Sequence, residues 1–146
     1  MKRKAASKPK PARFVGGCLC GAIRYRVVGE PIDAGYCHCK ICRRSAGAPV
    51  LAWATFPITG FSFTRGKPGT FHSSRRALRQ FCAGCGTQLV FRKTRGAETI
   101  DVNLVTLDRP EAIRPQYHIW TASRLPWFDT RDELPRHTDA GPDVLA

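Results

Sequence analysis

The chain reads CHCKIC at residues 37–42, GGCLCG at residues 16–21 and FCAGCG at residues 81–86. These three motifs contain all seven cysteines of the 146-residue chain. A CxxC followed by glycine is typical of a zinc knuckle, a tight turn in which two sulfurs converge while backbone amides point at the thiolates. The CxC and CxCxxC motifs strengthen this interpretation. The sequence therefore predicts a small protein organised around metal sites.

The number of cysteines predicts how the ligands are shared. Zinc prefers four tetrahedral ligands, so two closed sites need eight sulfurs where the chain supplies seven. The CxCxxC motif can place three sulfurs on one metal from a single loop, which leaves the CxC and CxxC motifs to complete a four-sulfur site. We expect two Zn²⁺ ions per chain, one closed and one with an open coordination position. The expected ligands are Cys18, Cys20, Cys82 and Cys85 for the closed site and Cys37, Cys39 and Cys42 for the open site.

Two other metal arrangements remain open at this point. Both sites could be closed and structural if a histidine supplies the eighth ligand, and the chain has four, at His38, His72, His118 and His137. An iron–sulfur cluster also accepts four cysteines, but that interpretation leaves the three-cysteine group unexplained.

Cysteine usage and hydropathy predict the compartment. Seven is an odd number, whereas a secreted disulfide framework normally uses an even number. No run approaches the roughly 18 apolar residues that a membrane-spanning helix needs, and the basic start of the chain is followed by polar residues rather than by the apolar stretch of a signal peptide. We expect a cytoplasmic protein with no membrane partner.

The net charge is concentrated at one end. The formal charge is +13, but six of the 24 basic residues lie in the first 13 positions, where there is no acidic residue. We expect a disordered basic tail at residues 1–13, one zinc domain at residues 14–135 and an irregular C-terminal tail at residues 136–146. Nucleic acid stays open as a partner of the basic tail, although this charge is weak support for it.

Alternating apolar residues predict a mainly β fold. Ile23, Tyr25 and Val27 share one face of a strand, and turn residues separate several such segments. We expect strands at residues 22–28, 50–56, 89–91 and 100–104, and a helical turn at residues 39–46. Residues 75–80 are ambiguous, and the proline-rich chain after residue 110 is expected to be irregular and packed over the sheet. Trp53, Trp120 and Trp127 are expected in the core or in a pocket wall.

A zinc ion on three thiolates favours a particular chemistry. The sulfurs donate so much negative charge that the zinc becomes a weaker Lewis acid, which disfavours hydrolysis. A substrate sulfur can instead occupy the open position as a thiolate and remain nucleophilic near neutral pH.

Taken together, the motifs resemble the glutathione-dependent formaldehyde-activating enzyme family, which includes centromere protein V. The resemblance lies in GGCLCGAIRY at residues 16–25, CHCKICRR at residues 37–44 and FCAGCGT at residues 81–87, and it covers about residues 14–135. It implies a GFA-type β-tent fold of stacked antiparallel sheets with zinc-ribbon-like knuckles. It also implies a structural zinc on the four-cysteine group, a catalytic zinc on the three-cysteine group, and a carbon–sulfur lyase that joins glutathione and formaldehyde.

Other residues near the motifs have two interpretations each. Arg43 and Arg44 could receive a carboxylate of glutathione or be solvated, and His38 and His118 could move protons or be structural. Ser45 and Gly47 could line the pocket or form a simple turn. A competing function of a different class is a zinc-stabilised binding module for nucleic acid or another acidic partner.

Overall fold

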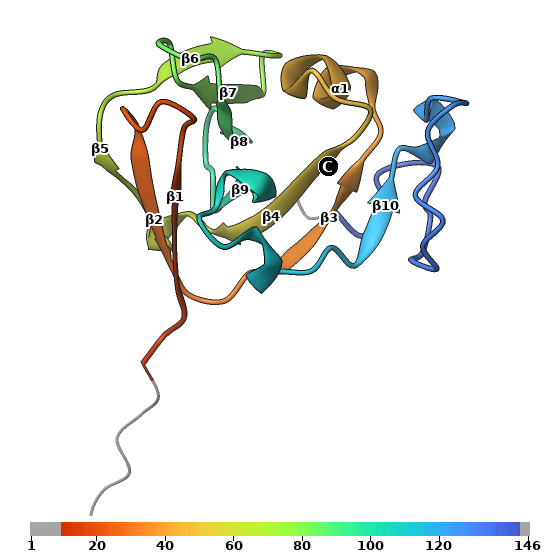
Figure 1. The fold of residues 1–146 in the computed structure, drawn as a ribbon, viewed down its shortest axis with the longest axis horizontal. Coiled ribbons are helices and arrows are strands. Elements are labelled where there is room, and N and C mark those ends of the chain that lie inside the picture. The colour runs from red at the N-terminus through yellow and green to blue at the C-terminus, as the bar shows by residue number, and fades with distance from the viewer. Residues whose placement is uncertain (1–9, 144–146) are drawn as a thin grey trace, which may run out of the picture.

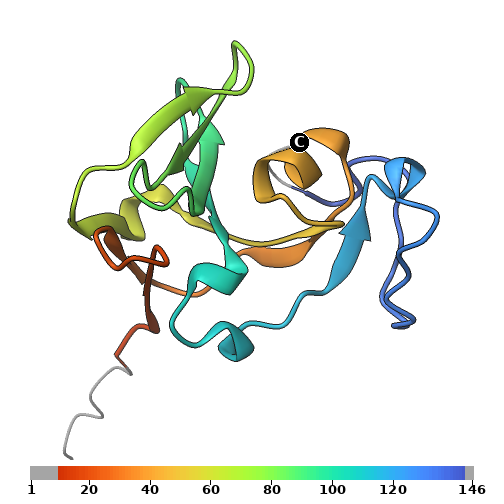
Figure 2. The same ribbon diagram turned by 45° about the horizontal axis from the view of Figure 1, so that its top comes forward.

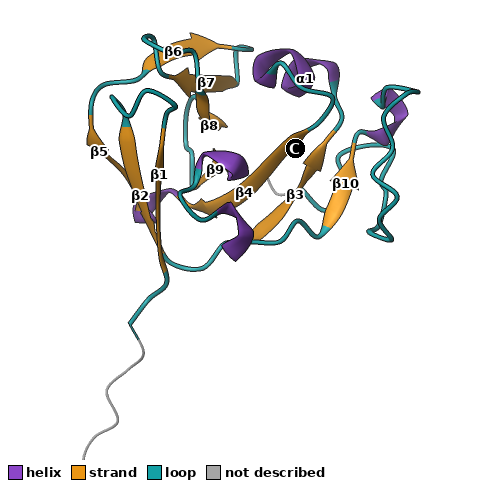
Figure 3. Cartoon of the chain, viewed as in Figure 1, coloured by secondary structure: helices purple, strands orange, loops and turns teal. Residues whose placement is uncertain are grey.

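A computed structural model describes residues 10–143 and shows strands with little helix (Figures 1 and 3). The expected basic tail therefore lies largely outside the described residues. The strands are β1 (Arg13–Gly17), β2 (Arg24–Val28), β3 (Asp33–Cys37), β4 (Leu51–Pro57), β5 (Phe61–Arg65), β6 (Gly69–His72), β7 (Ala77–Phe81), β8 (Gln88–Lys93), β9 (Thr99–Asn103) and β10 (Tyr117–Ile119). The helix is α1 (Lys40–Ala46), and short 3₁₀ turns are η1 (Ile58–Gly60), η2 (Leu104–Thr106), η3 (Pro110–Ala112) and η4 (Thr121–Ser123).

The strands form two sheets. The small sheet has the order β1-β2-β5, and the large sheet has the order β10-β3-β4-β9-β8-β7-β6. Every pair is antiparallel except β10 with β3, which is parallel. In the part of the chain that the structure describes, no helix is long and apolar enough to cross a membrane.

The mainly β class with stacked sheets is confirmed, together with the four expected strands and the helical turn. Of the ambiguous residues 75–80, those from 77 onward lie in strand β7. The prediction of an irregular chain after residue 110 is wrong for β10, which pairs with β3 across some 80 residues of sequence. Three residues are too few to show a period of two, so this strand has no local signal.

Alternation along the central strands separates the two faces of the large sheet. Ala54 and Phe56 of β4 and Val102 of β9 are fully buried on one face. Their neighbours Trp53 and Asp101 point to the opposite face, because successive side chains of a strand alternate.

The small sheet covers the first face. Tyr25 and Val27 of β2 belong to the same buried cluster as Ala54, Phe56 and Val102 of the large sheet. Figures 1 and 2 show the small sheet at one end of the molecule and strand β10 at the other end. One face of the large sheet is thus used for the core, and the other remains available for a site.

We expect Phe56→Ala to lower the free energy of unfolding by about 3–5 kcal/mol, because Phe56 is fully buried and its removal leaves a cavity. Phe71→Ala is the matched control: Phe71 is 62% exposed at the edge of the same sheet, and its loss should change stability by about 0.5 kcal/mol or less. Urea unfolding of the metal-saturated proteins measures both. An equal decrease in the free energy of unfolding in the two variants would contradict the assignment of Phe56 to the core.

Candidate functional site

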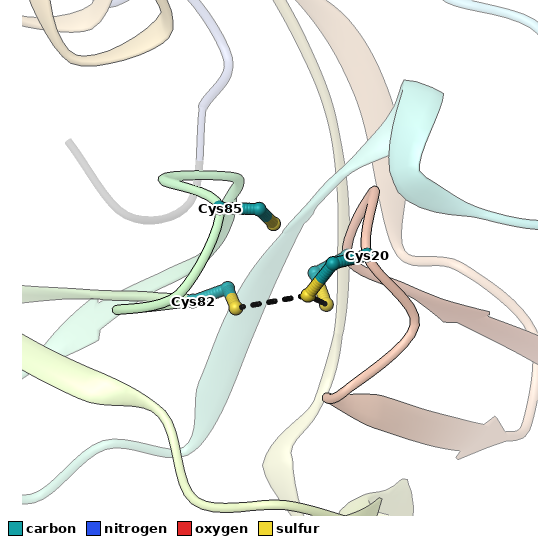
Figure 4. A group of neighbouring side chains, drawn as sticks. Cys20, Cys82 and Cys85 are labelled. Carbon is teal, nitrogen blue, oxygen red and sulfur yellow. Dashed lines mark hydrogen bonds between the residues drawn. The ribbon is translucent and has the colours of Figure 1, made fainter.

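Four cysteines meet where the two sheets join. Cys18 and Cys20 lie on the loop between β1 and β2, whereas Cys82 and Cys85 lie on the turn between β7 and β8. Figure 4 shows the side chains of Cys20, Cys82 and Cys85 pointing toward one another from these two loops. All four sulfur atoms lie within 4.8 Å of one another.

The spacing of these sulfurs fits a tetrahedral metal. Ligands about 2.3 Å from a zinc ion lie about 3.8 Å apart in a tetrahedron. The observed separations are 3.6 Å between the Sγ atoms of Cys18 and Cys20 and 3.8 Å between those of Cys20 and Cys82. The donor set therefore suits a soft divalent metal ion.

The backbone holds both loops in this geometry. Gly86 follows the CxxC turn with φ of 80°, a conformation that favours glycine. The Ile23 amide donates to Cys18 Sγ at 3.2 Å. Thr87 connects the loops, because its Oγ1 accepts from the Leu19 amide at 3.0 Å and lies 3.2 Å from Cys85 Sγ.

The other three cysteines surround the start of α1. Cys37 ends β3, Cys39 is the N-cap of the helix, and Cys42 lies in its first turn. Their sulfur atoms lie within 4.8 Å of one another, and the Cys42 amide donates to Cys39 Sγ at 3.3 Å. The short loop thus brings three sulfurs to one point, as the motif predicts.

The three thiols of this group differ in pKa. Hydrogen bonds from Cys37 and Cys42 lower the pKa of Cys39 to about 2. Hydrogen bonds to Cys39 and Cys42, with burial, raise the pKa of Cys37. The group therefore favours a thiolate at Cys39 even before a cation is bound, which suits it to metal binding.

A cavity of about 390 Å³ opens beside the three-cysteine group, within the size range of small-molecule sites. It is lined by all three cysteines of that group. Its apolar walls include Leu51, Trp53, Phe91, Ile119 and Trp120. These residues come from three separate segments, β4, β8 and the end of β10, that the fold brings together.

Gly35 leaves room for Trp53, a large side chain in the cavity wall. It is opposite Trp53 in the pairing of β3 with β4. A Cβ atom at Gly35 would lie 2.6 Å from the indole ring of Trp53. Any side chain there would displace the indole from the cavity.

A row of cross-strand partners lies across the cavity face of the sheet. Arg79 is opposite Phe91, Phe91 is opposite Asp101, and Asp101 is opposite Thr55. Arg79, Phe91 and Asp101 line the cavity. Two ionisable side chains thus lie in an otherwise largely apolar wall, on either side of an aromatic ring.

Asp101 is held by a short hydrogen-bonded chain. Thr55 Oγ1 donates to Asp101 Oδ1 at 2.7 Å and accepts from Trp53 Nε1 at 3.2 Å. Burial raises the pKa of Asp101 well above its ordinary value. A protonated carboxyl group can donate a hydrogen bond into the cavity, which an ionised one cannot.

His38 and His118 form a buried chain with Asp132. His38 Nε2 lies 2.8 Å from His118 Nδ1, and His118 Nε2 lies 3.0 Å from both carboxylate oxygens of Asp132. Because a carboxylate accepts, His118 Nε2 carries the hydrogen and its Nδ1 accepts from His38. Burial is the main cause that lowers the pKa of His38 to about 4. His118 also stacks on Tyr36, on the face of the sheet opposite the cavity.

Neither cysteine group includes a histidine within residues 10–143. Arg43 donates through Nε to the His38 carbonyl at 3.0 Å, and Ser45 donates to the Cys42 carbonyl at 3.0 Å. Arg44 and Ser45 line a neighbouring cavity beside α1. Both residues therefore lie next to the cavity of the three cysteines rather than in its wall.

The three tryptophans differ in position. Trp53 is buried and Trp120 is a cavity wall, which confirms the expectation for these two. The expectation is wrong for Trp127, which is 73% exposed. It lies in an irregular segment after η4 that leaves the ring uncovered.

Sequence reasoning missed two residues of the cavity wall, Arg79 and Asp101. Arg79 follows two other arginines in an ambiguous segment, so nothing in the local sequence distinguishes it. Asp101 stands between Ile100 and Val102, a pattern that normally indicates a solvent-exposed face. The pattern did indicate a face opposite the core, but not that this face encloses a cavity.

Comparison with known proteins agrees with this architecture. A family model described as glutathione-dependent formaldehyde-activating enzyme matches residues 13–123. An uncharacterized lyase of Schizosaccharomyces pombe is 35% identical over 98 residues, which cover 62% of this chain and 65% of that protein. The chain thus spans slightly less than two thirds of that relative.

Two further proteins are similar. A Halomonas elongata protein that carries the name of a glutathione-dependent formaldehyde-activating enzyme is 27% identical over 126 residues, 78% of each chain. The crystal structure of a Rhodobacter sphaeroides protein superposes with a TM-score of 0.54 at 24% identity, covering 84% of this chain and 98% of that one. This last likeness supports the fold. Since the family model matches most of the chain, and all three cysteine motifs lie within the match, the protein belongs to the glutathione-dependent formaldehyde-activating enzyme family.

Proposed function

We propose that the protein is a zinc-dependent carbon–sulfur lyase that acts on the hydroxymethyl adduct of a small thiol. One observation carries this proposal: the 390 Å³ cavity is lined by all three cysteines of the group that is one ligand short of a tetrahedral site. The name of the Halomonas relative and the lyase description of the yeast relative support the reaction class. A nucleic-acid partner gains no support from these relatives.

The two cysteine groups have different roles in this proposal. Cys18, Cys20, Cys82 and Cys85 hold a structural zinc that ties the small sheet to the large sheet. Cys37, Cys39 and Cys42 hold a catalytic zinc. When bound, the second ion supplies a Lewis-acid position at which a substrate thiol is kept deprotonated.

The chain contributes the surroundings of the reaction. Trp53, Phe91 and Ile119 exclude water from the substrate carbon, which strengthens electrostatic interactions in the cavity. Asp101, whose pKa burial raises, can donate a hydrogen bond to a substrate oxygen. In the synthetic direction the thiol sulfur bonds to the aldehyde carbon and the thiol proton ends on the oxygen. In the reverse direction that carbon–sulfur bond breaks and the aldehyde is released.

Glutathione and formaldehyde are the leading substrates. Both appear in the description of the family. Outside the first 13 residues the chain has 18 basic and 11 acidic residues, a formal charge of +7, which favours an anionic thiol such as this tripeptide with its two carboxylates.

We expect purified protein to contain about two zinc ions per chain, because one four-sulfur group and one three-sulfur group are present. Cys42→Ser should lose one metal and keep the fold. Cys82→Ser should unfold or aggregate, because binding of a structural metal contributes directly to folding free energy. Elemental analysis measures the zinc content of each variant, and circular dichroism measures whether it is folded.

The assignment of roles fails if the two variants lose structure equally. A single zinc per chain, or iron with visible absorbance, would contradict the metal sites themselves.

The two-zinc protein should accelerate exchange between glutathione and S-hydroxymethylglutathione above the enzyme-free rate, and Cys42→Ser should abolish the acceleration. Exchange NMR suits this measurement, because the addition also proceeds unaided in water. Arg92→Gln is a matched control, since Arg92 is opposite Leu78 on the other face of the sheet and should leave the rate unchanged. The lyase proposal would be abandoned if the parent neither accelerated exchange nor bound any of a panel of small thiols.

A further inference from the structure

Arg79 is an unusual residue for the wall of an apolar cavity. Only 6% of the residue is exposed, and its Nε atom is buried. Its Cζ lies 4.8 Å from the centre of the Phe91 ring, an arrangement typical of a cation–π contact. Burying such a charge is costly unless an anion compensates it.

The group in contact with the Arg79 guanidinium is a cysteine sulfur. Arg79 Nη2 donates to Cys42 Sγ at 3.5 Å, and its Nε is buried without a hydrogen-bond partner.

Two acidic residues share the cavity with Arg79. Asp101 lies beyond Phe91 in the cross-strand row, and its bond from Thr55 occupies one carboxyl oxygen. Its raised pKa reduces its negative charge further. Asp143 also lines the cavity, on a segment distant in sequence. The group in hydrogen-bond contact with Arg79 is therefore the three-cysteine centre.

The net charge of the three-cysteine centre gives its contact with Arg79 a role. Three thiolates with one divalent cation carry a net charge of −1, so a fourth thiolate must join a centre that is already anionic. A guanidinium in contact with one of the sulfurs brings the centre to neutrality before the substrate arrives. Arginine suits this position because it keeps its charge when buried.

We propose that Arg79 is the counter-charge of the three-cysteine centre and sets its affinity for an anionic sulfur ligand. The proposal rests on the proposed function, because it requires a divalent metal on Cys37, Cys39 and Cys42. Arg79 acts through Cys42 and is therefore a positioning residue. It makes the site selective for thiols that bind as thiolates over neutral ligands of the same size.

The test compares the two-zinc parent with Arg79→Met and Arg79→Lys. Methionine fills the same apolar wall without charge, whereas lysine restores the charge. The probe is 2-mercaptoethanol, whose body is uncharged, so its affinity reports on the sulfur alone. Calorimetry measures the Kd, and elemental analysis measures the zinc content of each variant.

We expect Arg79→Met to raise the Kd by about tenfold or more, the size of effect typical of a lost hydrogen bond to a charged group. Arg79→Lys should raise the Kd less than Arg79→Met does, because an ammonium group beside the anionic centre still supplies a positive charge. Arg92→Met, on the opposite face of the sheet, should bind like the parent.

Two results would count against different claims. If the parent binds thiol and the methionine and lysine variants have the same Kd at equal zinc content, Arg79 is not the counter-charge. If the zinc-loaded parent binds no thiol at all, the proposed function fails before any variant is compared.

Discussion

The hydrogen-bond register among β3, β4 and β9 is the constraint on which both the core and the cavity depend. Ala54 is opposite Ala34 and Val102, and this row points into the core. The next residue of β4, Thr55, is opposite Asp101 on the cavity face. A slip of one residue would exchange the two sets, burying a carboxyl group in the core and exposing valine. The apolar core therefore fixes the chemistry of the cavity wall.

The same register places the three-cysteine group. Cys37 is opposite Leu51 and next to Ile119 of β10, so its sulfur shares the cavity face with them. Two residues further on, Cys39 caps α1, and the first turn of that helix supplies Cys42. The end of a central strand and the start of a short helix are thus sufficient to build a three-sulfur site at the mouth of a cavity. The four-sulfur group lies elsewhere, at the junction of the two sheets, which is where a structural metal would contribute most to stability.

Much of this arrangement could be predicted from the sequence. The partition of the cysteines followed from their spacing, because zinc coordination is local chemistry with a fixed number of ligands. The longer strands could be predicted from the alternation of apolar and polar residues along them. Strand β10 and the chain from His38 through His118 to Asp132 could not be predicted, since both depend on pairings across some 80 residues of sequence. Arg79 and Asp101 were missed for a related reason, because alternation identifies the face that points away from the core but not whether that face meets solvent or a ligand.

Zinc X-ray absorption of the two-zinc protein, recorded with and without a small thiol, tests the central claim most directly. Seven cysteines on two zinc ions give an average of about 3.5 sulfur ligands per zinc, with an exchangeable light-atom ligand completing the open site. The account predicts that addition of thiol raises the average to about 4 and removes the light-atom contribution. An unchanged spectrum, or an imidazole contribution that persists in the presence of thiol, would show that the three-cysteine site is closed and would contradict the account.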